Sequence, residues 1–135
     1  YYLPELKALF PSEAAGVPTG NEYIYTEFLV DCERYLESLK VLAQYEVEFI
    51  LFAHNFFYSA ADTSGFFESA IRQSIQFRDR IGGLLDEYGT DLEAVKKIIK
   101  AEEYDPITEA KQPEPAYLIN LQAKVNAVVR WRENS

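Results

Sequence analysis

The 135-residue chain contains no methionine, one cysteine and one histidine, and each shortage narrows what the protein can be. Because Cys32 is the only cysteine, no disulfide can form within the chain, which excludes a disulfide-stapled secreted scaffold and fits the cytoplasmic location that we expect. Because His54 is the only histidine, the chain cannot supply a multi-histidine metal centre by itself. The absence of methionine, also at position 1, leads us to expect a piece of a longer protein.

Positive charge is also scarce, with 13 Lys and Arg against 22 Asp and Glu and a net charge of −9. A nucleic-acid binder needs a basic face to neutralise phosphates, and an anionic membrane attracts basic segments, so both partners are disfavoured. No stretch approaches the roughly 20 apolar residues of a membrane span. The 48% of hydrophobic residues is enough for a packed core, so we expect a soluble globular protein.

Apolar spacing predicts a mainly α protein with about four helices and one short apolar strand. The helices are expected at about 26–42, 66–88, 90–103 and 115–132. Residues 1–25 contain three prolines and two glycines and are predicted to form a loop segment. The chain therefore divides into this loop (1–25), a helix–strand–histidine element (26–58) and a C-terminal helical subdomain (59–135).

Helix ends are marked by local chemistry. Gly89 suits the C-terminal cap of the second helix, and Thr90 with Glu93 has the spacing of a capping box for the third. Gly82–Gly83 lies inside the second helix, where glycine is unfavourable. The pair predicts a kink or a close crossing with another helix.

Residues 47–52 form a β-branched and aromatic run that predicts a buried strand, with His54 just beyond its C-terminal end. Ligands and catalytic groups collect at such strand ends in open α/β proteins. A buried strand must pair its backbone groups, so either the first residues form a second strand or the sheet lies in chain outside this sequence. With exposed edges, the strand would pair across an interface, which predicts a homodimer or larger oligomer.

The residues around this strand resemble one family. The helix Tyr35-Leu36-Glu37-Ser38-Leu39-Lys40-Val41-Leu42, the strand 47–52 and the turn Ala53-His54-Asn55 look like the C-terminal third of the metallo-β-lactamase superfamily. Members carry a Y-x-x-S-L-x-x-L helix, a short strand and a G-H-G-type turn whose histidine is the last metal ligand. Ala53 and Asn55 replace the glycines of that turn. The later helices are similar to the helical extension of glyoxalase-II-like members.

The resemblance implies the C-terminal part of an αββα metal-dependent hydrolase that lacks most of its sheet. In that family two divalent ions, zinc or iron, activate a water that attacks an ester, thioester, amide or phosphoester. His54 would be a metal ligand in the parent protein only, because the family's H-x-H-x-D-H motif is missing here. The implied partner is the missing N-terminal portion. The chain alone would bind no metal tightly and be inactive.

Several residues keep two interpretations. Phe57 and Tyr58 would line a substrate pocket, or else pack beneath the long helix. Cys32 is more typical of a small core residue than of a reactive thiol. Arg130 and Arg132 flank Trp131, which suggests a cation–π contact.

For the whole chain, the alternative function is a self-contained helical module for protein interaction or oligomerisation without catalytic activity.

Overall fold

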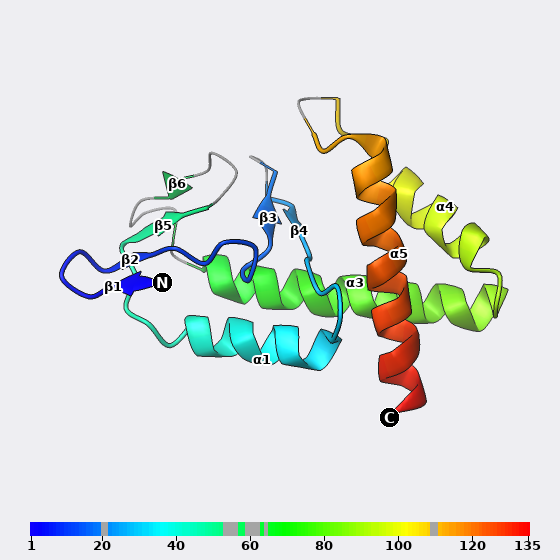
Figure 1. The fold of residues 1–135 in the computed structure, drawn as a ribbon, viewed down its shortest axis with the longest axis horizontal. Helices are drawn as coiled ribbons and strands as arrows, with labels where there is room; N and C mark the ends of the chain where they lie inside the picture. Colours follow the sequence, from blue (N-terminus) through cyan, green and yellow to red (C-terminus); the bar gives the residue numbers. More distant parts are fainter. Residues whose placement is uncertain (20–21, 53–56, 59–62, 64, 109–110) are drawn as a thin grey trace. The chain divides into compact units, whose positions relative to one another are not determined.

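The computed structural model describes residues 1–19, 22–52, 57–58, 63, 65–108 and 111–135 (Figure 1). Four helices lie in these ranges, α1 (Cys32–Leu42), α3 (Phe66–Tyr88), α4 (Leu92–Glu103) and α5 (Glu114–Glu133), together with six short strands. The mainly α class predicted from the sequence is confirmed. The chain forms two compact units, unit 1 (Tyr1–Glu27 with Glu33–Ile75) and unit 2 (Phe28–Cys32 with Gln76–Ser135).

Unit 1 contains a four-stranded sheet of order β1-β2-β5-β6. Its strands are β1 (Tyr2–Leu3), β2 (Ala8–Leu9), β5 (Phe49–Leu51) and β6 (Phe57–Tyr58). β2 and β5 are parallel, whereas β1 pairs with β2 and β6 pairs with β5 in antiparallel fashion. The helix α1 provides the crossover that a parallel pair requires.

The structure therefore answers the question that the strand at 47–52 raised. Of the two alternatives, the first holds: the first residues of the chain do form strands, and β2 pairs directly with β5. The exposed edges expected for this strand are wrong, because β5 has a neighbour on both sides. The loop predicted for residues 1–25 likewise contains β1, β2 and the hairpin strands β3 (Val17–Pro18) and β4 (Ile24–Tyr25). Strands of two residues are too short to produce a recognisable alternation.

The β3–β4 hairpin depends on a glycine that precedes it. Gly16 has φ +88°, and a Cβ at this position would lie 2.7 Å from Ile24 Cγ2 and 2.8 Å from the Tyr25 carbonyl oxygen. Both the backbone conformation and the space therefore require glycine. Ile24 is itself buried and belongs to the core of unit 1.

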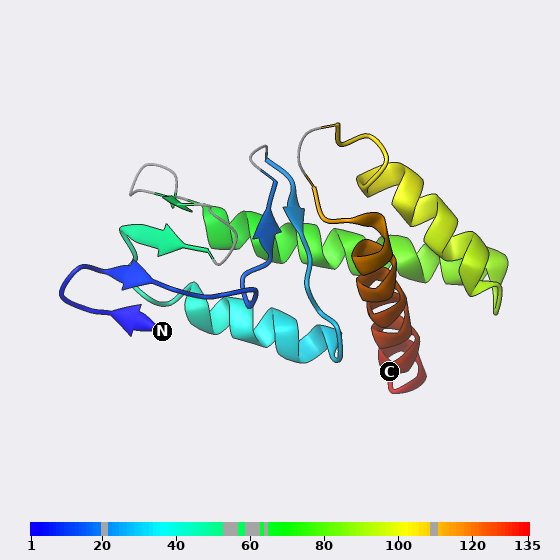
Figure 2. The ribbon, with the colours of Figure 1, turned by 45° about the horizontal axis from the view of Figure 1, so that its top comes forward.

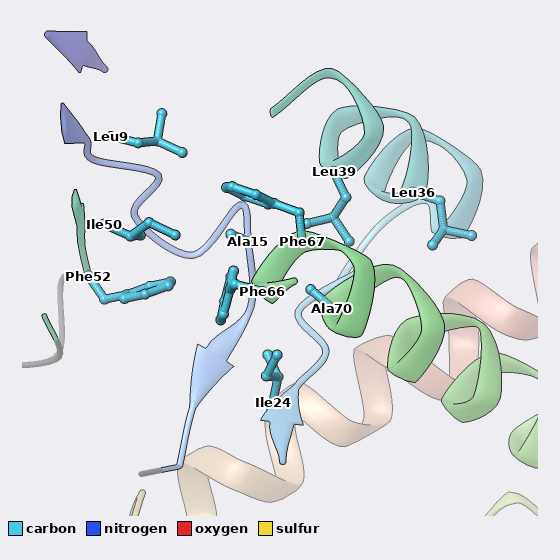
Figure 3. Packing of buried hydrophobic residues seen from close by; sticks show 10 residues of the cluster. All are labelled: Leu9, Ala15, Ile24, Leu36, Leu39, Ile50, Phe52, Phe66, Phe67 and Ala70. Carbon is cyan, nitrogen blue, oxygen red and sulfur yellow. The ribbon is translucent and has the colours of Figure 1, made fainter. Parts of the chain in front are cut away.

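The core of unit 1 brings together residues from β2, β4, β5, α1 and the start of α3, as Figure 3 shows. Leu36 and Leu39 come from α1, Ile50 and Phe52 from β5 and its end, and the start of α3 adds further side chains to the same cluster. The full set consists of Leu9, Ala15, Ile24, Leu36, Leu39, Ile50, Phe52, Phe66, Phe67 and Ala70. The three-and-four spacing in α1 is thus explained by one buried stripe.

The helix α1 begins at Cys32, later than the predicted start near residue 26. Asp31 stands immediately before it, at a position where aspartate is a preferred N-cap. Phe28, which was expected inside this helix, lies in an irregular segment and packs its ring 5.8 Å from that of Phe77 in unit 2. Phe28, one of the apolar residues that predicted this helix, therefore belongs to the core of unit 2 instead.

Gln73 on α3 fixes the end of the β3–β4 hairpin. Its Oε1 accepts a hydrogen bond from the Ile24 amide at 2.8 Å, and its Nε2 donates to the Glu22 carbonyl at 2.8 Å. The side-chain amide thus satisfies two backbone groups of the hairpin. Nearby, the buried Thr26 and Ser74 hydroxyls are 3.3 Å apart, and Ser74 donates to the Ala70 carbonyl.

We expect Gln73→Ala to destabilise the protein by about 1–2 kcal/mol, because it leaves two backbone groups of the hairpin without their partners. Gln76→Ala, an exposed glutamine one turn later in α3, is the matched control and should change stability by less than about 0.5 kcal/mol. Urea denaturation followed by circular dichroism measures both. Equal losses in the two variants would contradict this role of Gln73.

For α3, α4 and α5 the predicted helix boundaries hold to within one or two residues. The bounds of α3 match the prediction, and Gly89 follows it with φ +60°. For α4 the predicted cap is wrong: the N-cap is Asp91, whose side chain accepts from the Ala94 amide at 3.2 Å, rather than Thr90. α3 runs without interruption through Gly82–Gly83, which was predicted as a kink or a close crossing, and the Arg132 side chain of α5 contacts the Gly82 carbonyl. Figure 2 shows α5 crossing the second half of α3, and α4 contacts α5.

Unit 2 contains a buried polar contact between a tyrosine and a glutamate. The Tyr117 hydroxyl donates to Glu103 Oε1 at 2.8 Å, and both residues are buried. The Tyr117 ring stacks on Tyr104, with centroids 4.3 Å apart and an interplanar angle of 23°. The Tyr104 hydroxyl in turn donates to the Gln112 carbonyl at 2.7 Å. This pair of tyrosines joins α4, α5 and the segment between them.

We expect Tyr117→Phe to cost about 2 kcal/mol, because a buried hydrogen bond to a carboxylate is lost while the ring is kept. Tyr104→Phe is the matched variant and should cost about 1 kcal/mol, since its hydroxyl serves a neutral, partly buried backbone carbonyl. Thermal and urea unfolding give the two values. A larger loss for Tyr104→Phe than for Tyr117→Phe would contradict the stronger role of the Glu103 contact.

Candidate functional site

The candidate site lies at the C-terminal end of β5, where the sequence places His54 three residues beyond Leu51. Ile50, the central residue of β5, is 0% exposed and pairs with Leu9 on one side and Tyr58 on the other. A strand with two neighbours and a buried centre holds its ends in fixed places. The segment after Leu51 therefore starts from a strand end that is held on both sides.

The start of β5 is held by polar contacts. The Lys7 carbonyl accepts from the amides of Glu48 and Phe49 at 2.8 and 3.2 Å. The Lys7 ammonium lies 2.8 Å from Glu46 Oε1 and 3.9 Å from Glu48 Oε1. The hydrogen bond to Glu46 raises the pKa of Lys7 above its usual value. These carboxylates therefore lie at the end of β5 opposite to the one that leads to His54.

The end of β5 is held by apolar contacts. Phe52, two residues before His54, is 9% exposed and packs against Phe66 at the start of α3, with ring centroids 5.3 Å apart. His54 itself lies outside the described residues. Phe57 and Tyr58 form β6, which pairs with β5 in the register Leu51–Phe57 and Ile50–Tyr58. The sequence around His54 thus connects two neighbouring antiparallel strands, a hairpin that the strand prediction did not include.

Cys32 is a poor candidate for a metal ligand or a nucleophile. Cys32 is 1% exposed, and burial raises the pKa of its thiol to about 11. The thiol is therefore protonated at neutral pH, whereas metal binding and nucleophilic attack need the thiolate. This agrees with the interpretation of Cys32 as a core residue. In the parts of the chain that are described, no three His, Cys, Asp or Glu side chains are grouped so as to hold a metal ion.

The cation–π contact suggested for Trp131 exists, but with a different arginine. The Arg78 guanidinium on α3 lies 4.1 Å from the Trp131 ring centroid. The flanking arginines point elsewhere: Arg130 donates to the Val30 carbonyl at 2.8 Å, and Arg132 contacts the Gly82 carbonyl and Asp86. Adjacent residues of a helix do not face each other, so sequence neighbours were a poor guide to this contact.

Comparisons with known proteins do not assign the chain to a family. No protein-family model matches it, and no curated protein is significantly similar to it. In addition, none of the helices within the described ranges combines the length and apolar character that a bilayer crossing requires. The functional argument therefore depends on the site itself.

Proposed function

We propose that this chain is the C-terminal portion of a metal-dependent hydrolase that resembles the metallo-β-lactamase superfamily, and that it is inactive by itself. The observation that carries the proposal is the placement of β5: a buried strand, parallel to β2, leads directly to the only histidine. The α1–β5 order with the Tyr35–Leu42 sequence supports the same family. The N-terminal portion of the same protein would be its partner.

The residues present fit one ligand of such a centre and no more. A catalytic zinc takes about three protein ligands and keeps one open position, and His54 supplies a single imidazole. Two bound zinc or iron ions would lower the pKa of the attacking water. The chain's own contribution would be to supply His54 directly after the paired strand β5, whose end is held by the Phe52–Phe66 contact. Phe57 and Tyr58 stay the proposed substrate-pocket residues.

The test compares the complete gene product, the 135-residue chain and His54→Asn in the complete protein. Metal analysis and isothermal titration with Zn²⁺ should show about two tightly held ions in the complete protein and at most weak binding by the chain alone. His54→Asn should remove about one ion and reduce ester or thioester hydrolysis by roughly 100-fold or more. Glu48→Gln, an exposed carboxylate at the start of β5, should change neither reading.

Two results would overturn the proposal. One is nanomolar zinc binding together with ester hydrolysis by the 135-residue chain, which would make it an enzyme in its own right. The other is a complete gene product that lacks the H-x-H-x-D-H motif, or in which His54→Asn keeps full metal content and activity.

A self-contained interaction module is the second candidate, and one observation favours it. Both edges of β5 are paired within the chain, so this strand needs no partner from outside. If this second candidate is right, the chain unfolds cooperatively as a monomer, and the complete gene product has no H-x-H-x-D-H motif before this sequence.

Self-association, as a homodimer or larger, stays a prediction, and it must now use a surface other than β5. Light scattering on the 135-residue chain measures it.

A further inference from the structure

Unit 2 carries a groove between the second half of α3 and the last turns of α5. Its volume is about 470 Å³, and its lining is mostly apolar. One wall is a single stripe of α3 consisting of Asp79, Gly82, Gly83 and Asp86, at the spacing of one helix face. The opposite wall is formed by Trp131 and Arg132 of α5.

The α3 wall of the groove is recessed because two helix-interior residues, Gly82 and Gly83, have no side chain. A Cβ at Gly82 would come no closer than 3.6 Å to another residue, the Arg132 Nη1 atom, and a Cβ at Gly83 would meet no described atom within 4 Å. Close packing therefore does not require either glycine. Glycine is among the least favourable residues inside a helix, so the pair weakens α3 without a packing benefit inside unit 2. Its effect is to leave room above the helix backbone.

The walls of the groove are fixed in place. The Arg78 guanidinium stacks on the Trp131 ring at 4.1 Å and at the same time lies 3.0 Å from Asp79 Oδ1. On the other side, Arg132 contacts both the Gly82 carbonyl and the Asp86 carboxylate. The indole and the two carboxylates are thus positioned by contacts within unit 2. A partner would meet a preformed surface, which reduces the entropy lost on binding.

The rim of the groove carries two exposed carboxylates, each of which is paired with one arginine. Asp79 and Asp86 are seven residues apart, which corresponds to about 10.5 Å along a helix. Their side chains are 59% and 70% exposed, so each carboxylate keeps acceptor positions for a second cation in addition to its arginine. The net charge of −9 reinforces attraction of a basic partner and opposes the seating of a second copy of this chain.

We propose that this groove docks a basic amphipathic helix of a partner protein. An apolar side chain of that helix sits over Gly82–Gly83 and against Trp131. Two lysines or arginines spaced seven residues apart on the same helix meet Asp79 and Asp86, because equal spacing on two helices gives equal separation. The groove is open along α3, which suits a helix in a groove better than an enclosed small molecule.

Trp131 is the only tryptophan in the chain, so its fluorescence reports on the groove directly. The probe is a synthetic helical peptide of leucine and lysine with lysines seven residues apart, and its counterpart carries glutamate in place of lysine. We expect the lysine peptide to bind and to shift the Trp131 emission. The glutamate peptide should bind at least about tenfold more weakly, as expected for charge complementarity.

Gly83→Leu fills the groove without changing any charge, and leucine is a better helix former than glycine, so the variant should fold. We expect it to weaken binding of the lysine peptide at least about tenfold, because the apolar seat is occupied. The double variant Asp79→Asn/Asp86→Asn should weaken binding by a similar factor. Glu5→Gln/Glu68→Gln removes the same charge from exposed positions elsewhere and should leave binding within about twofold.

Circular dichroism on each variant establishes that it is folded, and anisotropy of a labelled peptide measures affinity independently of Trp131. Unchanged affinity in Gly83→Leu would overturn the proposal, because general attraction to an acidic protein does not depend on the groove. Absence of binding, binding without a Trp131 response, or equal binding of the glutamate peptide would overturn it as well.

Discussion

Ile50→Ala should destabilise the protein by about 3–4 kcal/mol, the largest effect that we expect from a single substitution. Ile50 is 0% exposed and is the central residue of β5, between Leu9 of β2 and Tyr58 of β6. Truncation removes three carbon atoms from a packed core and leaves a cavity that the short strands cannot readily close. Urea denaturation followed by circular dichroism measures the loss.

Two variants make the result specific. Ile50→Val removes one methyl group and should cost about 1 kcal/mol. Leu51→Ala changes a half-buried residue whose side chain leaves β5 on the opposite face, and it should cost clearly less than Ile50→Ala. A loss below about 1 kcal/mol for Ile50→Ala would show that β5 is not a central element of unit 1, and the positioning of His54 would lose its support.

The protein should lose roughly 3 kcal/mol of stability at alkaline pH through one thiol. Burial raises the pKa of Cys32 to about 11 from an ordinary value of 9.0, while the Arg78 charge opposes the shift. Each unit of pKa difference corresponds to 1.36 kcal/mol. Because the folded state holds this proton more tightly, the contribution is complete below pH 9.0 and is lost as the pH rises towards 11.

Cys32→Ala removes the titrating group and is the direct comparison. Burial also raises the pKa of Tyr35, but this tyrosine is present in both proteins, so its effect cancels in the difference. We expect the stability difference between wild type and Cys32→Ala to shift by roughly 2 kcal/mol between pH 8 and pH 11, where the folded thiol is half titrated, as measured by urea denaturation. A pH-independent difference would show that the thiol is not desolvated.

Long periodic segments were predictable from the sequence, and contacts between distant residues were not. The bounds of α3 follow directly from its apolar stripe and from Gly89. The cap of α4 was misplaced by one residue, because Thr90 and Asp91 are both good caps and only geometry decides between them. The strands β1 to β4 have two residues each, too few for a pattern, and they form only because tertiary partners complete their pairing.

The candidate site could be predicted in part for the same reason. The position of His54 after a buried strand is a local feature, and the buried, paired β5 agrees with it. The strand β6 was not predicted, because the sequence before the aromatic run shows no recognisable turn pattern that would mark a second strand. Gly82–Gly83 was interpreted as a kink or crossing, since helix glycines usually have one of those roles. The groove above them becomes evident only with Trp131 placed opposite.

The division into two units has a consequence for how such a protein can arise or be rearranged. The chain passes from unit 1 to unit 2 after Glu27, returns after Cys32 and leaves again after Ile75. Residues 28–32 complete unit 2 through the Phe28–Phe77 contact and the bond from Arg130 to the Val30 carbonyl. Neither unit is encoded by one uninterrupted stretch of gene. Exchange of a single continuous segment of the gene therefore cannot transfer either unit whole.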